Sequence, residues 1–135
     1  DYRFIAAGKK LMGVNEIKLG VPIPFPADCI LRELVGFHKA REITDSGNFY
    51  LPDQLLQFGM VDKIVPLPQL QSESIGKAQL LGSFPAEGFS MIKQNRAERV
   101  EEQIRRHLDK KEQYFLDCWF SESARERLKE AAKKF

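Results

Sequence analysis

Three prolines at every second position constrain the fold of this chain more than any other feature. In "GVPIPFPADC", Pro22, Pro24 and Pro26 each hold φ at about −65° and lack a backbone N–H. Such a segment fits neither the interior of a helix nor a central strand. We therefore expect a stiff loop here, and it directly follows a segment that carries the acidic residue Glu16.

Short extended segments and helices are expected to alternate through the first two thirds of the chain. Before the loop, side-chain alternation predicts strands over residues 1–7 and 12–19, with a turn at Gly8 between them. The second strand would place Glu16 on one face together with Val14 and Lys18. After the loop, the glycine positions predict helices over residues 26–36 and 37–47, a short helix ending at Gly59 and an apolar strand over residues 60–65.

From Leu70 onward the pattern is helical. It predicts a helix that ends by Gly82, a new helix opened by Pro85, a long helix over residues 97–119 and a last helix from Ser123 with Glu126 as its capping-box partner. We interpret the chain as α/β and helix-rich. Residues 1–82 would hold the short strands and the Glu16 region, and residues 83–135 a helical region for oligomerisation and for covering the site. The apolar side chains Phe115, Trp119 and Phe120 would need a partner surface.

Composition limits the classes of partner. With 21 basic and 19 acidic residues, the net charge of +2 provides no bulk field for nucleic acid or an anionic membrane. No apolar run approaches the roughly 18 residues of a membrane span, and no signal-peptide pattern is present. We interpret Cys29 and Cys118 as buried free thiols of a reducing, cytoplasmic compartment, with a disulfide as the alternative.

Most residues that could bind a metal, a phosphate or a substrate show no motif for such a role. His38 and His107 have no second ligand at metal-binding spacing, so we expect no metal site. Neither a glycine-rich phosphate loop nor a Gly-x-Ser-x-Gly elbow occurs. The lysines near the end of the chain fit a solvated helix face.

Glu16 allows two interpretations. It can lie on a solvated strand face beside Lys18. Alternatively, it is held among apolar neighbours such as Val14, Ile23 and Phe25, where poor solvation would favour its protonated form. A carboxyl group of that kind can take a proton from carbon and return it elsewhere, provided that it is fixed close to the reacting atom. The stiff loop after Glu16 would help to fix it.

Several segments carry a family resemblance. "DYRFIAAGKKLMGVNEIKLGVPIPFP", "LRELVG", "GMVDKIVP" and the closing "SESARERLKEAAKKF" resemble the enoyl-CoA hydratase/isomerase (crotonase) superfamily. The Asn-Glu-x-x-x-Gly-x-x-x-Pro and Gly-Met-Val-Asp-Lys-Ile-Val-Pro segments are the most specific of these. The resemblance extends over essentially all 135 residues.

The resemblance implies a fold, a substrate and a site. The fold would be the end of a spiral of strand–strand–helix turns followed by a block of helices, in subunits that form trimers or hexamers. The substrate would be an acyl-CoA thioester, with no further cofactor, and two backbone N–H groups would stabilise the thioester enolate. Glu16 matches the family's proton-carrying glutamate. Pro24 and Phe25 would bind the substrate. Lys134 and Phe135 would also bind it, at the point where the last helix approaches the CoA nucleotide.

Departures from the family pattern narrow the expected reaction and bear on whether this chain is active by itself. Where hydratases continue into a glycine-rich stretch, this chain has Val21 and the proline loop, which looks more like the enoyl-CoA isomerase branch. The family's N-terminal half, with its oxyanion groups, is absent, so we expect a C-terminal fragment that is inactive by itself. Hydration of an enoyl-CoA, thioester hydrolysis or decarboxylation, and a non-catalytic oligomerisation module stay open as alternatives.

Overall fold

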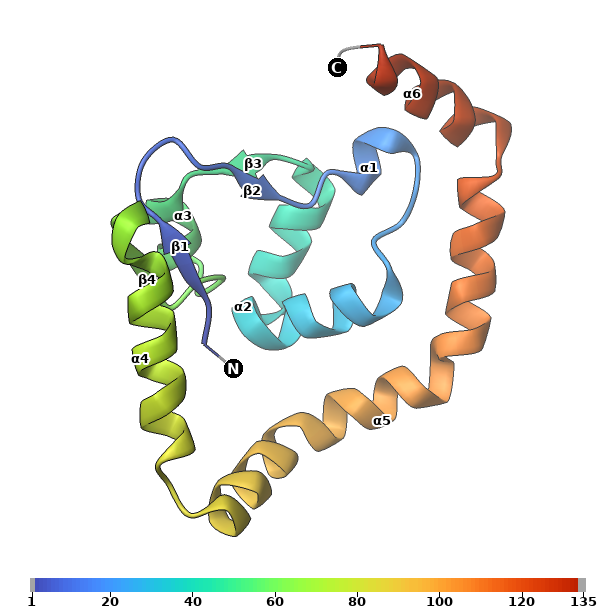
Figure 1. The fold of residues 1–135 in the computed structure, drawn as a ribbon. Helices are drawn as coiled ribbons and strands as arrows, with labels where there is room; N and C mark the ends of the chain where they lie inside the picture. Colours follow the sequence, from blue (N-terminus) through green and yellow to red (C-terminus); the bar gives the residue numbers. More distant parts are fainter. Residues whose placement is uncertain (1, 134–135) are drawn as a thin grey trace. The chain divides into compact units, whose positions relative to one another are not determined.

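The computed structural model describes residues 2–133. Its elements run in this order (Figure 1): β1 Phe4–Ala6, β2 Met12–Gly13, α1 Glu16–Leu19, α2 Phe25–Ser46, β3 Phe49–Tyr50, α3 Pro52–Gln57, β4 Lys63–Val65, the 3-10 turn η1 Leu67–Gln69, α4 Leu70–Gly82, α5 Ala86–Trp119 and α6 Glu122–Ala132. The structure is thus rich in helix, and its strands are short.

The chain forms two compact units, each assembled from an early and a late segment. Unit 1 comprises Asp1–Met12 and Tyr50–Glu102, and unit 2 comprises Gly13–Phe49 and Gln103–Phe135. Helix α5 therefore contributes its first part to unit 1 and the remainder to unit 2. The functional division that we expect at residues 82 and 83 stays a prediction.

Unit 1 is built on a parallel pair of strands. β1 pairs with β4 in the register Phe4 to Lys63, Ile5 to Ile64 and Ala6 to Val65, and the Ala7 N–H donates to the Val65 carbonyl at 2.7 Å. Both strands fall inside the segments predicted from the sequence, which are longer than the strands that form. The fully buried Leu55 of α3 lies in this unit's core with the buried Ala6 and Val65.

An ion pair joins the residue before β1 to the residue before β4. Arg3 donates to Asp62 three times: from Nε to Oδ2 at 3.0 Å, from Nη2 to Oδ1 at 3.1 Å and from the backbone N–H to Oδ2 at 2.7 Å. The Asp62 N–H returns a hydrogen bond to the Arg3 carbonyl at 2.8 Å. Burial by itself would raise the pKa of Asp62, but the hydrogen bonds and charge of Arg3 outweigh it and hold this pKa below its ordinary value.

Asp62→Asn is expected to lower the free energy of unfolding by about 1–2 kcal/mol at neutral pH. The substitution removes the bidentate, charge-assisted ion pair with Arg3, which is only partly exposed. A carboxyl group whose pKa is lowered on folding stabilises the protein above its unfolded pKa. That contribution is lost as the pH falls through the folded pKa, below 3.8. Urea titrations at neutral and acid pH should therefore show the wild type and the variant converging in acid. An equal gap at both pH values, or an equal loss in the exposed Asp109→Asn control, would contradict this account.

Unit 2 differs from the sequence prediction at the residues around Glu16. Residues 12–19 do not form one strand: β2 stops at Gly13, and Glu16 begins the one-turn helix α1. Gly20 ends this helix in the left-handed region at φ 76°, where a residue without a Cβ is least strained. Alternation of apolar and polar residues over four positions is too short to separate a strand from one helical turn.

The helices expected after the loop do form. α2 contains a break at Gly36, with φ 75° and ψ 161°, which separates the two predicted helices, and Gly47 closes the second at φ 56°. The fully buried Ile43 lies on this helix, together with the buried Leu31 and Ala40.

The last third is helical, with two differences from the prediction. The helix opened by Pro85 and the predicted helix over residues 97–119 are one helix, α5. The N-cap of α6 is Ser121, whose Oγ accepts from the Ala124 N–H at 3.3 Å, so the capping box from Ser123 to Glu126 is wrong. Within residues 2–133, no helix combines the length and the apolar character that crossing a membrane requires.

Candidate active site

Glu16 is the residue around which the candidate site is built. It is the first residue of α1, preceded by Asn15 at the N-cap position, and its backbone carbonyl accepts from the Val21 N–H at 3.1 Å. The side chain is half-buried, and its Oε2 atom is buried without a hydrogen-bond partner among the described residues. Buried polar atoms in proteins are nearly always paired, so an unpaired carboxylate oxygen is a candidate for contact with a substrate.

A cavity of about 450 Å³ lies in the same unit. Val14 and Ile17, on either side of Glu16 in the sequence, line it together with Val21. Glu16 itself is not a lining residue. The other walls of the cavity come from the proline loop, α2 and α5: Pro22, Ile23, Phe25, Asp28, Thr44, Asp45, Lys111, Tyr114, Phe115 and Cys118. Most of the lining is apolar or aromatic, as in pockets that take an organic ligand.

The proline loop leads into one wall of this cavity. Pro24 is exposed and serves as the N-cap of α2 with φ −53° and ψ 132°, and Phe25 follows as the first helical residue. The Phe25 ring meets His107 edge to face, with ring centroids 6.3 Å apart, and the Lys111 Nζ lies 5.6 Å from its centroid. Of the two loop residues assigned to substrate binding, Phe25 lines the cavity and Pro24 does not. The substrate-binding role of both stays a prediction.

The two cysteines differ in environment. Cys29 is buried, and burial raises the pKa of its thiol although the nearby Arg32 and Lys111 charges oppose the rise. Cys118 is exposed and lines the cavity, so its expected burial is wrong. Both are free thiols. Residues 2–133 contain no group of three His, Cys, Asp or Glu side chains that could hold a metal ion.

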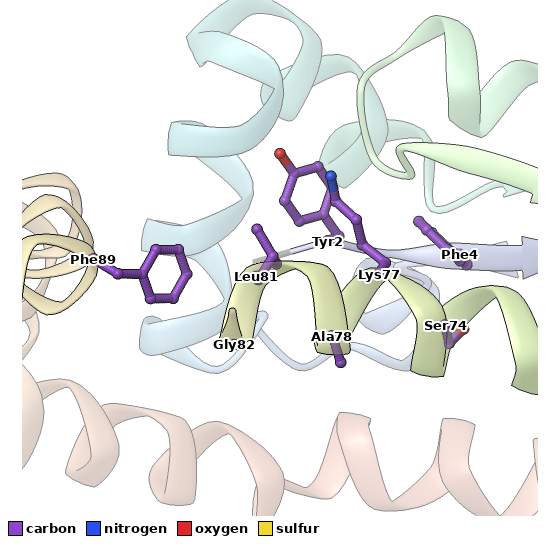
Figure 2. Close-up of a pocket in the computed structure, with 8 residues that line it drawn as sticks. All are labelled: Tyr2, Phe4, Ser74, Lys77, Ala78, Leu81, Gly82 and Phe89. Atoms are coloured by element: carbon purple, nitrogen blue, oxygen red, sulfur yellow. The ribbon is translucent and has the colours of Figure 1, made fainter. Parts of the chain in front are cut away.

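A second cavity, of about 340 Å³, lies in unit 1 (Figure 2). The segment before β1, β1 itself, α4 and the start of α5 supply its lining residues, Tyr2, Phe4, Ser74, Lys77, Ala78, Leu81, Gly82 and Phe89. Lys77 lies over the Tyr2 ring, with Nζ 3.9 Å from the ring centroid. None of the lining residues carries a carboxylate, so this cavity has no group suited to proton transfer at carbon.

The remaining predicted site residues, Lys134 and Phe135, lie outside the described residues. Sequence reasoning also missed the residues that hold α1 in place: Lys18, Asn48, Ala124 and Arg127. They belong to segments far apart in the chain, and no local pattern in the sequence indicates that they meet.

Comparisons with known proteins identify the family of the chain. The family model described as enoyl-CoA hydratase/isomerase matches residues 1–135. The chain therefore belongs to the enoyl-CoA hydratase/isomerase family.

Among curated relatives, a 76-residue stretch is 34% identical to human mitochondrial enoyl-CoA delta isomerase 1, and it covers 56% of this chain and 25% of that protein. An 80-residue stretch is 32% identical to the fatty acid oxidation complex subunit alpha of Colwellia psychrerythraea, and it covers 59% of this chain and 11% of that protein. The matched stretches thus span at most a quarter of these two relatives.

Solved structures establish the fold. The crystal structure of human mitochondrial delta3-delta2-enoyl-CoA isomerase matches with a TM-score of 0.91 at 24% identity, and the match covers 99% of this chain and 52% of that one. Carnitinyl-CoA hydratase from Mycobacterium avium matches with a TM-score of 0.85 at 17% identity, covering 99% and 52%. The helix-rich α/β fold of the crotonase superfamily is thus confirmed, and the chain spans about half the length of these structures.

Proposed function

We propose that this chain is the part of an enoyl-CoA isomerase that carries the proton-transferring glutamate, Glu16. The observation that supports this most directly is the buried, unpaired Oε2 atom of Glu16 in a chain of the enoyl-CoA hydratase/isomerase family. The similarity to a curated enoyl-CoA delta isomerase favours isomerisation over other reactions of that family. Glu16 would be the proton acceptor, and its sequence neighbours Val14 and Ile17 line the apolar cavity of the same unit.

The proposed reaction moves one proton between two carbons. The Glu16 carboxylate removes a proton from carbon 2 of a 3-enoyl-CoA, and the electron pair of that C–H bond delocalises into a thioester dienolate. The protonated Glu16 then delivers the proton to carbon 4, and the double bond comes to lie between carbons 2 and 3. Atoms and charge balance without an added cofactor or water. Backbone N–H groups that stabilise the dienolate oxygen would lower the barrier further.

The acyl chain would be bound by the apolar cavity of unit 2, where Phe25 and Ile23 form part of the wall. Pro24 would also bind the substrate, and Lys134 and Phe135 would approach the CoA nucleotide. The active form would be a homo-oligomer, trimeric or hexameric, in the cytoplasm. Association through α5 would cover the exposed aromatic rings of Trp119 and Phe120.

An isomerase assay tests this function. The complete protein that contains residues 1–135 is expected to convert a 3-enoyl-CoA into the 2-enoyl-CoA, which is followed by ultraviolet absorbance. The 135-residue chain by itself is expected to be inactive, because the resemblance assigns the oxyanion N–H groups to the family's N-terminal half. Isomerisation by the isolated chain would contradict that expectation. A complete protein that only hydrates 2-enoyl-CoA, or only releases CoA, would overturn the isomerase proposal in favour of a hydratase or a hydrolase.

A further inference from the structure

We propose that helix α6 positions the Glu16 carboxylate, with Ala124 and Arg127 holding the turn that ends α1. This inference rests on the proposed function of Glu16 as a proton carrier. It assigns no chemical step to α6. Arg127 and Ala124 would be positioning residues, and their effect would reach the substrate only through α1.

The contact between α6 and α1 is close and specific. Ala124 is fully buried, and a Cβ added at Gly20 would lie 3.6 Å from the Ala124 Cα and 3.3 Å from the Arg127 Cδ. The Arg127 Nη1 donates to the Lys18 carbonyl at 3.5 Å. The last carbonyls of a helix have no partner within it and carry partial negative charge. A guanidinium at this end of α1 therefore stabilises it where its own hydrogen bonds stop.

A second contact holds α1 from the end of α2. A Cβ added at Gly47 would lie 2.8 Å from the Ile17 Cγ2 and 3.2 Å from the Lys18 Cγ, so the backbone of Gly47 lies directly against α1. The Lys18 Nζ also donates to the Asn48 Oδ1 at 3.0 Å. Helix α1 is thus held between the end of α2 and the start of α6.

These contacts matter because α1 is too short to fix its own orientation. At its ends, the Lys18, Gly20 and Val21 N–H groups donate to the carbonyls of Asn15, Ile17 and Glu16 at 3.0, 3.3 and 3.1 Å. Helices far shorter than about 12 residues are marginal in water without tertiary packing. Proton transfer to and from carbon requires the base to be held close to the reacting atom. The packing of α6 would therefore determine how often Glu16 points at that atom.

The test compares three variants of the complete protein. Arg127→Ala is expected to lower kcat for isomerisation by about 10- to 100-fold, the range for misplacement of a catalytic group, with KM within about twofold of the wild type. Arg127→Lys keeps a donor for the Lys18 carbonyl and should recover most of kcat. Arg125→Ala removes an exposed arginine from the same helix and should leave kcat unchanged. Equal kcat in the Arg127→Ala variant and the wild type, or a rise in KM alone, would overturn the inference.

Hydrogen exchange separates this inference from the proposed function. In Arg127→Ala, the amides of Gly20 and Val21, which bond back into α1, should exchange faster than in the wild type, while amides of the β1–β4 pair should not change. Unchanged exchange at Gly20 and Val21 overturns the inference even if the wild type is an active isomerase. A wild type without isomerase activity overturns the proposed function. Faster exchange at Gly20 and Val21 in that case would still show that Arg127 holds α1 in place.

Discussion

Glu16→Gln is expected to lower kcat of the complete protein for isomerisation of a 3-enoyl-CoA by about 10²- to 10⁴-fold, the usual contribution of a general acid–base group. Glutamine keeps the length and shape of the side chain, so the packing of α1 is preserved. Its amide, however, cannot accept a proton from carbon and deliver it again. Acyl-CoA binding, measured by calorimetry, should change little, because the cavity walls do not include Glu16.

The matched control is Glu98→Gln, an exposed glutamate in the unit 1 part of α5. It makes the same chemical change away from the site and should leave both kcat and KM at wild-type values. Wild-type turnover in Glu16→Gln would remove this residue from the mechanism. A loss of acyl-CoA binding equal to the loss of rate would assign Glu16 to binding rather than to proton transfer.

Elements that depend on local backbone rules could be predicted from the sequence. Gly36 and Gly47 end two helices because each adopts a positive φ that other residues disfavour. Pro22 and Pro24 fall in a loop because they lack N–H donors. The strands that pair as β1 and β4 were predicted as apolar extended segments. Their parallel pairing, between residues 59 positions apart, has no local signal.

The element that carries Glu16 could not be predicted in the same way. The residues from Glu16 to Leu19 alternate in polarity, which favours a strand, but four positions are too few to separate a strand from one helical turn. One helical turn forms instead, and it is in contact with Gly47 and Arg127, which are distant in the sequence. The cavity was missed for the same reason, because Lys111 and Cys118 reach its wall from α5. The acidic residue itself was found, since its identity and the following prolines are local features.

Gly13→Ala is expected to lower the free energy of unfolding by about 3 kcal/mol, at the upper end of the range for overpacked sites. A Cβ at this position would collide with the carbonyl oxygen of Asn48 and would lie 3.0 Å from the Phe49 Cα. Both obstacles are backbone atoms, so no side-chain rotation relieves the collision and β2 must move away from this segment. Because Asn48 also accepts from Lys18 of α1, the movement should disturb the turn that carries Glu16.

Urea denaturation of Gly13→Ala beside Gly76→Ala separates this collision from the general effect of replacing glycine. Gly76 is exposed in the interior of α4, and a Cβ there would meet nothing within 4 Å. Alanine at that position should raise the free energy of unfolding by about 0.5–1 kcal/mol, because glycine loses more backbone entropy in a helix. The two substitutions add the same methyl group with opposite expected signs. A Gly13→Ala variant as stable as the wild type would show that β2 can move away from Asn48 without cost, and that this close approach does not help to fix the segment leading to Glu16.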